Sequence, residues 1–84
     1  MSQFDRLLLK IRMLDKNMRF EELQKVLEHY GYKMSGPRSG SSHRSFRKPG
    51  HEPITIPQHE PIKRVYVEMV RDMIESEERD EEDD

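Results

Sequence analysis

The centre of the chain carries a short basic segment with one aromatic residue, Gly40-Ser41-Ser42-His43-Arg44-Ser45-Phe46-Arg47-Lys48. A β-strand sends successive side chains to opposite faces. Phe46 therefore lies on one face of such a strand, and the other face carries three polar residues, His43, Ser45 and Arg47. If Phe46 anchors the strand to a hydrophobic core, His43 must lie on the outer surface beside a cation. The segment thus predicts a strand with one structural face and one face available for chemistry.

Two further strands are predicted, one on each side of this segment. Tyr32-Lys33-Met34 forms the first, and the glycine, proline and serine content of residues 35–41 predicts a loop after it. Pro49-Gly50 is typical of a turn. Residues 52–57 then alternate, with Ile54 and Ile56 on the same face, and predict the third strand.

Three amphipathic helices are predicted around the strands. The first, over residues 3–14, opens with a capping-box-like pair, Ser2 and Asp5. The second begins at Phe20 and ends at Gly31, which is expected to form a left-handed cap. The last is expected to have Pro61 in its first turn.

The last helix is predicted from a long apolar stripe, made up of Ile62, Val65, Tyr66, Met69, Val70, Met73 and Ile74. The stripe stops at Ile74 and is followed mainly by carboxylates. Negative charge is unfavourable at the carboxyl end of a helix because it opposes the helix dipole. We therefore expect the helix to fray soon after Ile74.

The order helix, helix, strand, strand, strand, helix predicts an α+β fold. Each element has only one apolar side, so we expect a three-stranded antiparallel sheet with helices covering one face. His43, Ser45 and Arg47 then lie on the uncovered face, which is expected to be an open surface and not a pocket.

The composition allows one small domain with a thin core, because the 84 residues are 32% hydrophobic and 38% charged. The chain has no cysteine, which excludes disulfides and thiolate metal sites. The sequence shows neither the apolar run of a signal peptide nor a stretch of membrane-spanning length, so we expect a cytoplasmic protein without a membrane partner.

The net charge of −2 is unevenly distributed. Residues 75–84 contain eight carboxylates and one cation, whereas the first 74 residues contain 14 cations and 9 carboxylates, a balance of +5. A basic body suggests a polyanionic partner. The acidic tail could compete with such a partner for the basic face, which predicts that deleting residues 77–84 raises affinity for a polyanion such as RNA at low salt.

Several short motifs occur in an order that resembles a known family. They are the helix from Leu23 to Gly31, then Ser42-His43-Arg44-Ser45-Phe46-Arg47, then Pro49-Gly50, and then Thr55-Ile56-Pro57-Gln58-His59. In this order and spacing they resemble the HicA toxins of bacterial toxin-antitoxin systems, over Phe20 to Ile74.

The resemblance implies a double-stranded-RNA-binding-domain-like fold and ribonuclease activity on messenger RNA, with His43 as the catalytic histidine. It also implies a HicB-type antitoxin as partner. On this basis we expect an accessory N-terminal helix (residues 1–18), a HicA-like core (residues 19–76) and a disordered acidic tail (residues 77–84).

The chemistry of RNA cleavage without a metal ion requires a base for the 2′-hydroxyl proton and a cation that stabilises the phosphorane. Imidazole can serve as the base near neutral pH. We expect no cofactor, and we expect RNA to be bound by the cations of this region and one hydroxyl, with Arg47 as the phosphate clamp: Arg47, Lys48, Arg44, Lys33, Arg38 and Ser45. A second acid is not assigned, so we expect either a slow enzyme or one in which the proton for the leaving group comes from water.

Two other functions remain open on the sequence alone. The chain could be a non-catalytic RNA-binding module of the same fold, or a protein-interaction module that uses its N-terminal apolar stripe. The repeat of His51-Glu52-Pro53-Ile54 as His59-Glu60-Pro61-Ile62 could suggest two metal ligands. The copies flank a strand and lack further ligands nearby, so we expect no metal site.

Overall fold

The computed structural model describes residues 2–35 and 43–82, with side chains through Arg79. Its elements are helices α1 (Gln3–Arg12) and α2 (Phe20–His29), strands β1 (Lys33–Ser35), β2 (His43–Arg47) and β3 (Ile54–Pro57), and helix α3 (Arg64–Glu82). The predicted order of helices and strands is confirmed. Among the described residues, none of the helices combines the length and the apolar character that crossing a membrane requires.

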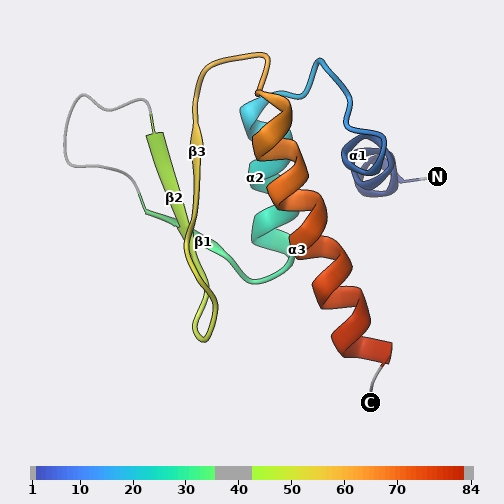
Figure 1. The fold of residues 1–84 in the computed structure, drawn as a ribbon, viewed down its shortest axis with the longest axis vertical. Helices are drawn as coiled ribbons and strands as arrows, with labels where there is room; N and C mark the ends of the chain where they lie inside the picture. The colour runs from blue at the N-terminus through green and yellow to red at the C-terminus, as the bar shows by residue number, and fades with distance from the viewer. Residues whose placement is uncertain (1, 36–42, 83–84) are drawn as a thin grey trace.

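The three strands form one antiparallel sheet in the order β1-β2-β3. The central strand aligns Phe46 with Met34 on one side and with Ile54 on the other. All three helices lie on the same side of the sheet (Figure 1). The predicted α+β fold, with a sheet covered on one face, is therefore confirmed.

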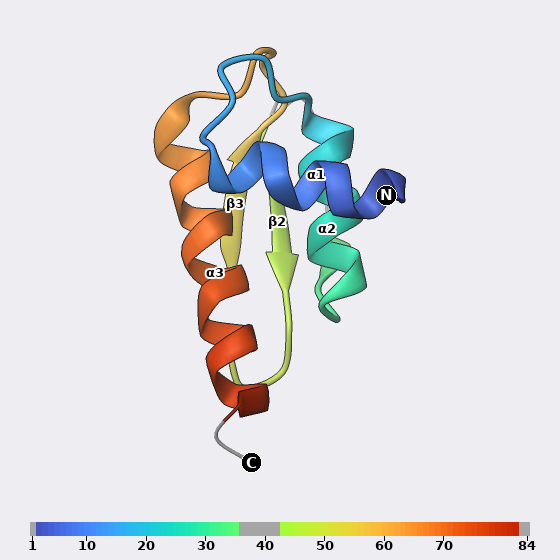
Figure 2. The same ribbon diagram turned by 90° about the vertical axis from the view of Figure 1, so that its right-hand side faces the viewer.

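The molecule is built in three layers. Helices α2 and α3 lie next to the sheet, and α1 crosses them on the side away from the strands (Figures 1 and 2). Ile11 of α1 is fully buried and joins the common core. Two ion pairs also hold α1 in place, one from Lys10 to Glu22 at 2.8 Å and one from Arg12 to Glu78.

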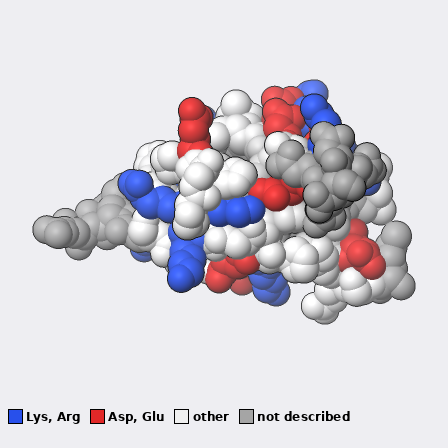
Figure 3. Space-filling model, turned by 90° about the horizontal axis from the view of Figure 1, so that it is seen from below, with Lys and Arg blue, Asp and Glu red and all other residues white. Residues whose placement is uncertain are grey.

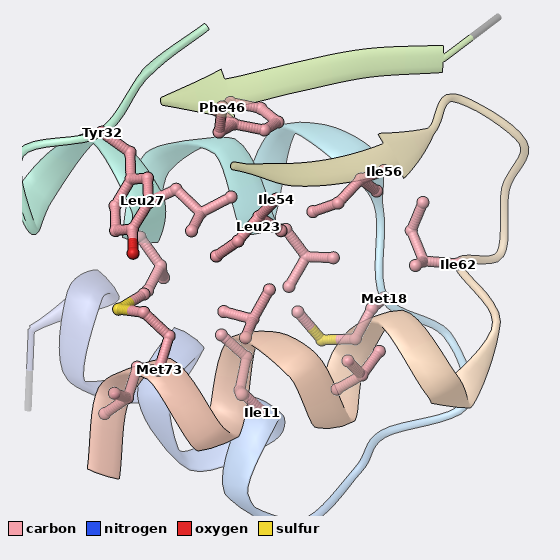
Figure 4. Close-up of a cluster of buried hydrophobic side chains, with 14 of the residues drawn as sticks. Ile11, Met18, Leu23, Leu27, Tyr32, Phe46, Ile54, Ile56, Ile62 and Met73 are labelled. Carbon is pink, nitrogen blue, oxygen red and sulfur yellow. The ribbon is translucent and has the colours of Figure 1, made fainter. Parts of the chain in front are cut away.

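The core fills the space between the sheet and the helices. Phe46 points from β2 into this space, where it belongs to the same buried cluster as side chains from the helices (Figure 4). The buried residues at its centre are Ile11, Met18, Leu23, Val26, Leu27, Phe46, Ile56, Val67, Val70 and Ile74. A single connected core explains how 84 residues form one domain.

The predicted helix caps are both present. Ser2 Oγ accepts a hydrogen bond from the Asp5 amide at 3.1 Å, and the Asp5 carboxylate accepts one from the Ser2 amide at 3.4 Å. At the end of α2, Gly31 has φ of 96°. The amide of Tyr32 donates to the carbonyl of Leu27 at 3.0 Å, as in a Schellman motif.

The expected start of the last helix is wrong. Helix α3 begins at Arg64, after Pro61 and Ile62. The Ile62 amide donates to the Met18 carbonyl at 2.9 Å, and the Glu60 carboxylate accepts a hydrogen bond from the Phe20 amide at 3.0 Å. These bonds tie residues 60–62 to Met18 and to the first residue of α2, and α3 begins only after this segment.

The buried face of α3 also differs from the predicted stripe. Val67 is fully buried, whereas Val65 and Met69 are 53% and 38% exposed. The predicted stripe is confirmed at Ile62, Val70, Met73 and Ile74, which are buried, and Tyr66 packs against the core. The errors are the omission of Val67 and the inclusion of Val65 and Met69.

The expected end of α3 near Ile74 is wrong as well, because the helix continues to Glu82. Glu77 pairs with Lys48 at 2.6 Å, and Glu78 pairs with Arg12. These partners come from the β2–β3 turn and from α1. They compensate for the unfavourable position of the carboxylates at the negative end of the helix.

Candidate active site and nucleic-acid interface

Strand β2 presents the two faces that its sequence predicts. Phe46 is fully buried, and its ring lies 5.9 Å from that of Phe20, measured between centroids. His43 and Arg47 are exposed, and Ser45 is half-buried. Because the ring of Phe46 is buried on one face, the imidazole of His43, the first residue of the strand, lies on the solvent-facing side.

The outer face of the sheet is polar along the whole of β2. Directly opposite residues in antiparallel strands share a face, which places Lys33 beside Arg47 and Thr55 beside Ser45. The hydroxyl oxygens of Ser45 and Thr55 lie 3.2 Å apart. The face thus carries two cations at one end, hydroxyl groups in the middle and His43 at the other end.

His43 lines a pocket, so the expectation of an open surface is wrong at this position. The pocket has a volume of about 370 Å³ and is lined by His43, Pro57, His59, Pro61, Lys63 and Tyr66. His43 is aligned with Pro57, the last residue of β3. The chain after Pro57 turns over this end of the sheet before it enters α3 (Figure 1). His59 and Pro61 of this turn form the second wall of the pocket.

The second wall is fixed by the same two hydrogen bonds that delay the start of α3. Glu60 binds the Phe20 amide at 3.0 Å, and the Ile62 amide binds the Met18 carbonyl at 2.9 Å. Both residues lie within three positions of His59. The loop that carries His59 is therefore tied to the amino end of α2.

Arg47 lies too far along β2 to share a phosphate group easily with His43. Four residue steps separate them in the strand, which corresponds to roughly 13 Å between Cα atoms. Lys63, by contrast, lines the same pocket as His43. Arg47 and Lys33 are thus better placed for a neighbouring phosphate, and Lys63 for the phosphate beside His43.

Lys48 and Arg44 have surroundings that the sequence did not reveal. Lys48 binds Glu77 at 2.6 Å, and its Nζ lies 5.7 Å from the centre of the Tyr32 ring. Burial raises the pKa of the Tyr32 phenol; the charge of Lys48 opposes this shift, and that of Glu77 adds to it.

Arg44 is half-buried and lies on the same side of β2 as Phe46. Arg38 lies outside the described residues.

The end of the molecule around the β2–β3 turn carries mixed charge. Seen from this end, the basic and acidic side chains of the described residues are interspersed (Figure 3). The pairing of Lys48 with Glu77 contributes to this mixture. On the outer face, the two cations Lys33 and Arg47 lie directly opposite each other in the sheet.

The two copies of the His-Glu-Pro-Ile repeat occupy opposite ends of β3. His51 lies at the β2–β3 turn, with its Nε2 3.9 Å from the Glu77 carboxylate. His59 lies beyond the other end, in the wall of the pocket. Among the residues with described side chains, no three potential metal ligands gather at one place.

Sequence reasoning missed the three polar residues that share the pocket with His43, namely His59, Lys63 and Tyr66. From the sequence, His59 is part of the motif that ends the third strand and a possible metal ligand, with no predicted role in RNA binding or cleavage. The signal that could have identified it is its place two residues after Pro57, the residue aligned with His43 across the sheet. That alignment requires the strand register, which the sequence pattern did not provide.

Comparison with known protein families identifies the chain. The family model described as the HicA toxin of bacterial toxin-antitoxin systems matches residues 20–75 of the 84-residue chain. The chain therefore belongs to the HicA toxin family, whose members are the toxins of toxin-antitoxin pairs and have an antitoxin as partner. No curated protein and no solved structure matches the chain. The matched range begins at α2, so α1 lies outside it.

Proposed function

We propose that this protein is an endoribonuclease that cleaves messenger RNA without a metal ion, and that a HicB-like antitoxin neutralises it. His43 is its catalytic histidine, and the cytoplasm, where messenger RNA is translated, is its compartment. The observation that carries the proposal is the position of His43: it is exposed at the head of β2 and lines a pocket that also contains Lys63.

The reaction begins at the 2′-hydroxyl of the nucleotide before the scissile phosphate. The imidazole of His43 takes the proton of this hydroxyl while the 2′ oxygen attacks phosphorus. Lys63 stabilises the negative charge of the phosphorane. The bond to the 5′ oxygen then breaks and this oxygen takes up a proton, which leaves a 2′,3′-cyclic phosphate and a 5′-hydroxyl end.

The cations of the outer face support binding of a neighbouring part of the RNA. Lys33 and Arg47 lie directly opposite each other in the sheet. Like charges in this arrangement are unfavourable, and an RNA phosphate between them would remove the repulsion. Ser45 and Thr55 lie between this pair and His43 and offer hydroxyl groups to the RNA backbone.

The test is cleavage of a messenger RNA by the purified protein in the presence of EDTA. We expect cyclic phosphate ends with the wild type and a rate about 10²–10⁴-fold lower with His43→Ala. His51→Ala serves as the matched control, since His51 is an exposed histidine at the other end of β3, and it should cleave at the wild-type rate. Induced expression in a bacterium should stop growth with the wild type and with His51→Ala only.

Binding without cleavage would contradict the proposal and support a non-catalytic RNA-binding module. Absence of RNA binding at physiological salt would support a protein-interaction module instead. Cleavage that EDTA abolishes would contradict the metal-independent mechanism.

A further inference from the structure

The pocket that contains His43 brings in a second histidine from a different segment. His43 is the first residue of β2, and His59 lies in the loop between β3 and α3. Both side chains are exposed, and both line the pocket of about 370 Å³. This volume is near the lower end of the range of small-ligand sites, about 300–1,000 Å³. The pocket therefore has the size to hold a single phosphodiester group and its immediate neighbours, and not a long stretch of RNA.

The strand register limits the distance between the two histidines. Aligned residues of antiparallel strands have Cα atoms within about 5.5 Å, and His43 is aligned with Pro57. His59 is two residues further, which adds at most about 7 Å. Two imidazoles on backbones within roughly 12 Å can approach one phosphate group from different walls of the pocket, each at the hydrogen-bond reach of about 2.6–3.2 Å.

Cleavage of the phosphodiester leaves one chemical requirement that His43 does not meet. When the bond from phosphorus to the 5′ oxygen breaks, this oxygen leaves with the electron pair of the bond and must gain a proton. His43 at that moment has just taken the 2′ proton, on the side of the attacking oxygen. In-line displacement places the leaving oxygen on the opposite side of phosphorus, so a different group must donate there.

We propose that His59 is the general acid that donates this proton, an inference that rests on the nuclease function proposed above. The pocket contains four titratable side chains, and His43 already serves as the base. Of the remaining types, imidazole is the one that both holds and releases a proton near neutral pH. After the step, His59 is neutral and His43 is protonated, and exchange with water restores both.

The loop around His59 is built to hold the donor in place. Glu60 and Ile62 are bonded to the Phe20 amide and to the Met18 carbonyl. In the other copy of the repeat, Glu52 is exposed and His51 lies near Glu77 at the far end of β3. The same four-residue sequence thus provides an internal control, because only the second copy reaches the pocket.

The test uses two RNA substrates that differ in one atom. The first is an ordinary RNA with a single scissile site, and the second carries sulfur in place of the bridging 5′ oxygen at this site. A thiolate leaves without gaining a proton, so the second substrate does not need a general acid. His59→Gln and His59→Ala are compared with the wild type, with His43→Ala and with His51→Ala, after their folding has been checked by circular dichroism.

We expect both His59 variants to cleave the ordinary RNA about 10²–10⁴-fold more slowly than the wild type and the sulfur substrate at a rate near that of the wild type. His43→Ala should be slow on both substrates, and His51→Ala should be normal on both. His59 variants that cleave ordinary RNA at the wild-type rate would overturn the inference while the nuclease function stands. Equal slowing on both substrates would also overturn it, because it would show that His59 positions the substrate and does not donate the proton. A wild type that cleaves neither substrate would overturn the proposed function itself.

Discussion

The inner face of β2 should determine stability and its outer face activity. Separate replacements of Phe46 and His43 test this directly. Phe46 is fully buried and packs against the ring of Phe20. Truncation of a buried phenylalanine to alanine costs about 3–5 kcal/mol. A chain of 84 residues has a total unfolding free energy of roughly 4–13 kcal/mol, at about 0.05–0.15 kcal/mol per residue. Phe46→Ala should therefore remove about a quarter or more of the stability.

His43 is exposed at the first position of the same strand, and replacement of an exposed residue changes stability by only about 0.5 kcal/mol. The measurement is urea denaturation followed by circular dichroism. With a slope of about 1–1.5 kcal/mol per molar urea, Phe46→Ala should lower the midpoint by roughly 2–5 M, and His43→Ala should leave it nearly unchanged.

The milder variant Phe46→Leu keeps the position apolar, so it should cost about 1–2 kcal/mol and retain RNA cleavage within a few-fold of the wild type. His43→Ala should show the opposite behaviour, with full stability and no cleavage. The reasoning fails if Phe46→Ala is as stable as the wild type, or if His43→Ala loses more than about 1 kcal/mol.

Four further outcomes follow from the contacts around α1, α2 and α3. Ile11→Ala should lower the unfolding free energy by about 2–5 kcal/mol in urea, because Ile11 is fully buried between α1 and the core; an unchanged midpoint would show that α1 does not contribute to the domain. Glu77→Gln should destabilise the protein by about 1 kcal/mol, and a double-mutant cycle with Lys48→Met should recover part of this loss, whereas strict additivity would show that the pair at 2.6 Å has no coupling. Burial alone would raise the pKa of the Glu22 carboxyl, but hydrogen bonds from the Lys10 ammonium and from the amide of Arg19, the residue before α2, outweigh it and hold the pKa below its ordinary value. The stability that this carboxylate contributes is thus present above its unfolded-state pKa and lost as the pH falls through the lower folded-state pKa, so Glu22→Gln should flatten the acid side of a plot of stability against pH; equal slopes would contradict the assignment. Deletion of residues 80–84 should raise RNA affinity at low salt and leave the two ion pairs of α3 intact, and unchanged affinity would show that the acidic end does not compete with RNA.

The elements of the fold could be predicted because their signals are local. A capping box at Ser2 and a left-handed glycine at position 31 mark helix ends through bonds to residues a few positions away. The period of two in β2 and β3 predicted which side chains enter the core, and Phe46, Ile54 and Ile56 are indeed buried.

The errors lie where distant residues determine the outcome. Helix α3 begins late because residues 60–62 bind the linker before α2, and it ends late because Glu77 and Glu78 find cations elsewhere in the fold. None of these partners is a neighbour in sequence. The pocket at His43 was missed for the same reason, since its second wall depends on the β2–β3 register and on the path of the chain after Pro57.

The register of β2 and β3 therefore links the core to the chemistry. Alignment of Phe46 with Ile54 closes the core, and the same alignment, three residues away, places His43 beside Pro57 at the mouth of the pocket. A shift of one residue between the strands would move every side chain of β2 to the opposite face. Phe46 would then be exposed, and His43 would lie on the side of the helices, away from His59. Because burial of the phenyl ring opposes this shift, the residue that stabilises the sheet also sets the position of the imidazole, although it lies on the face of β2 opposite to His43.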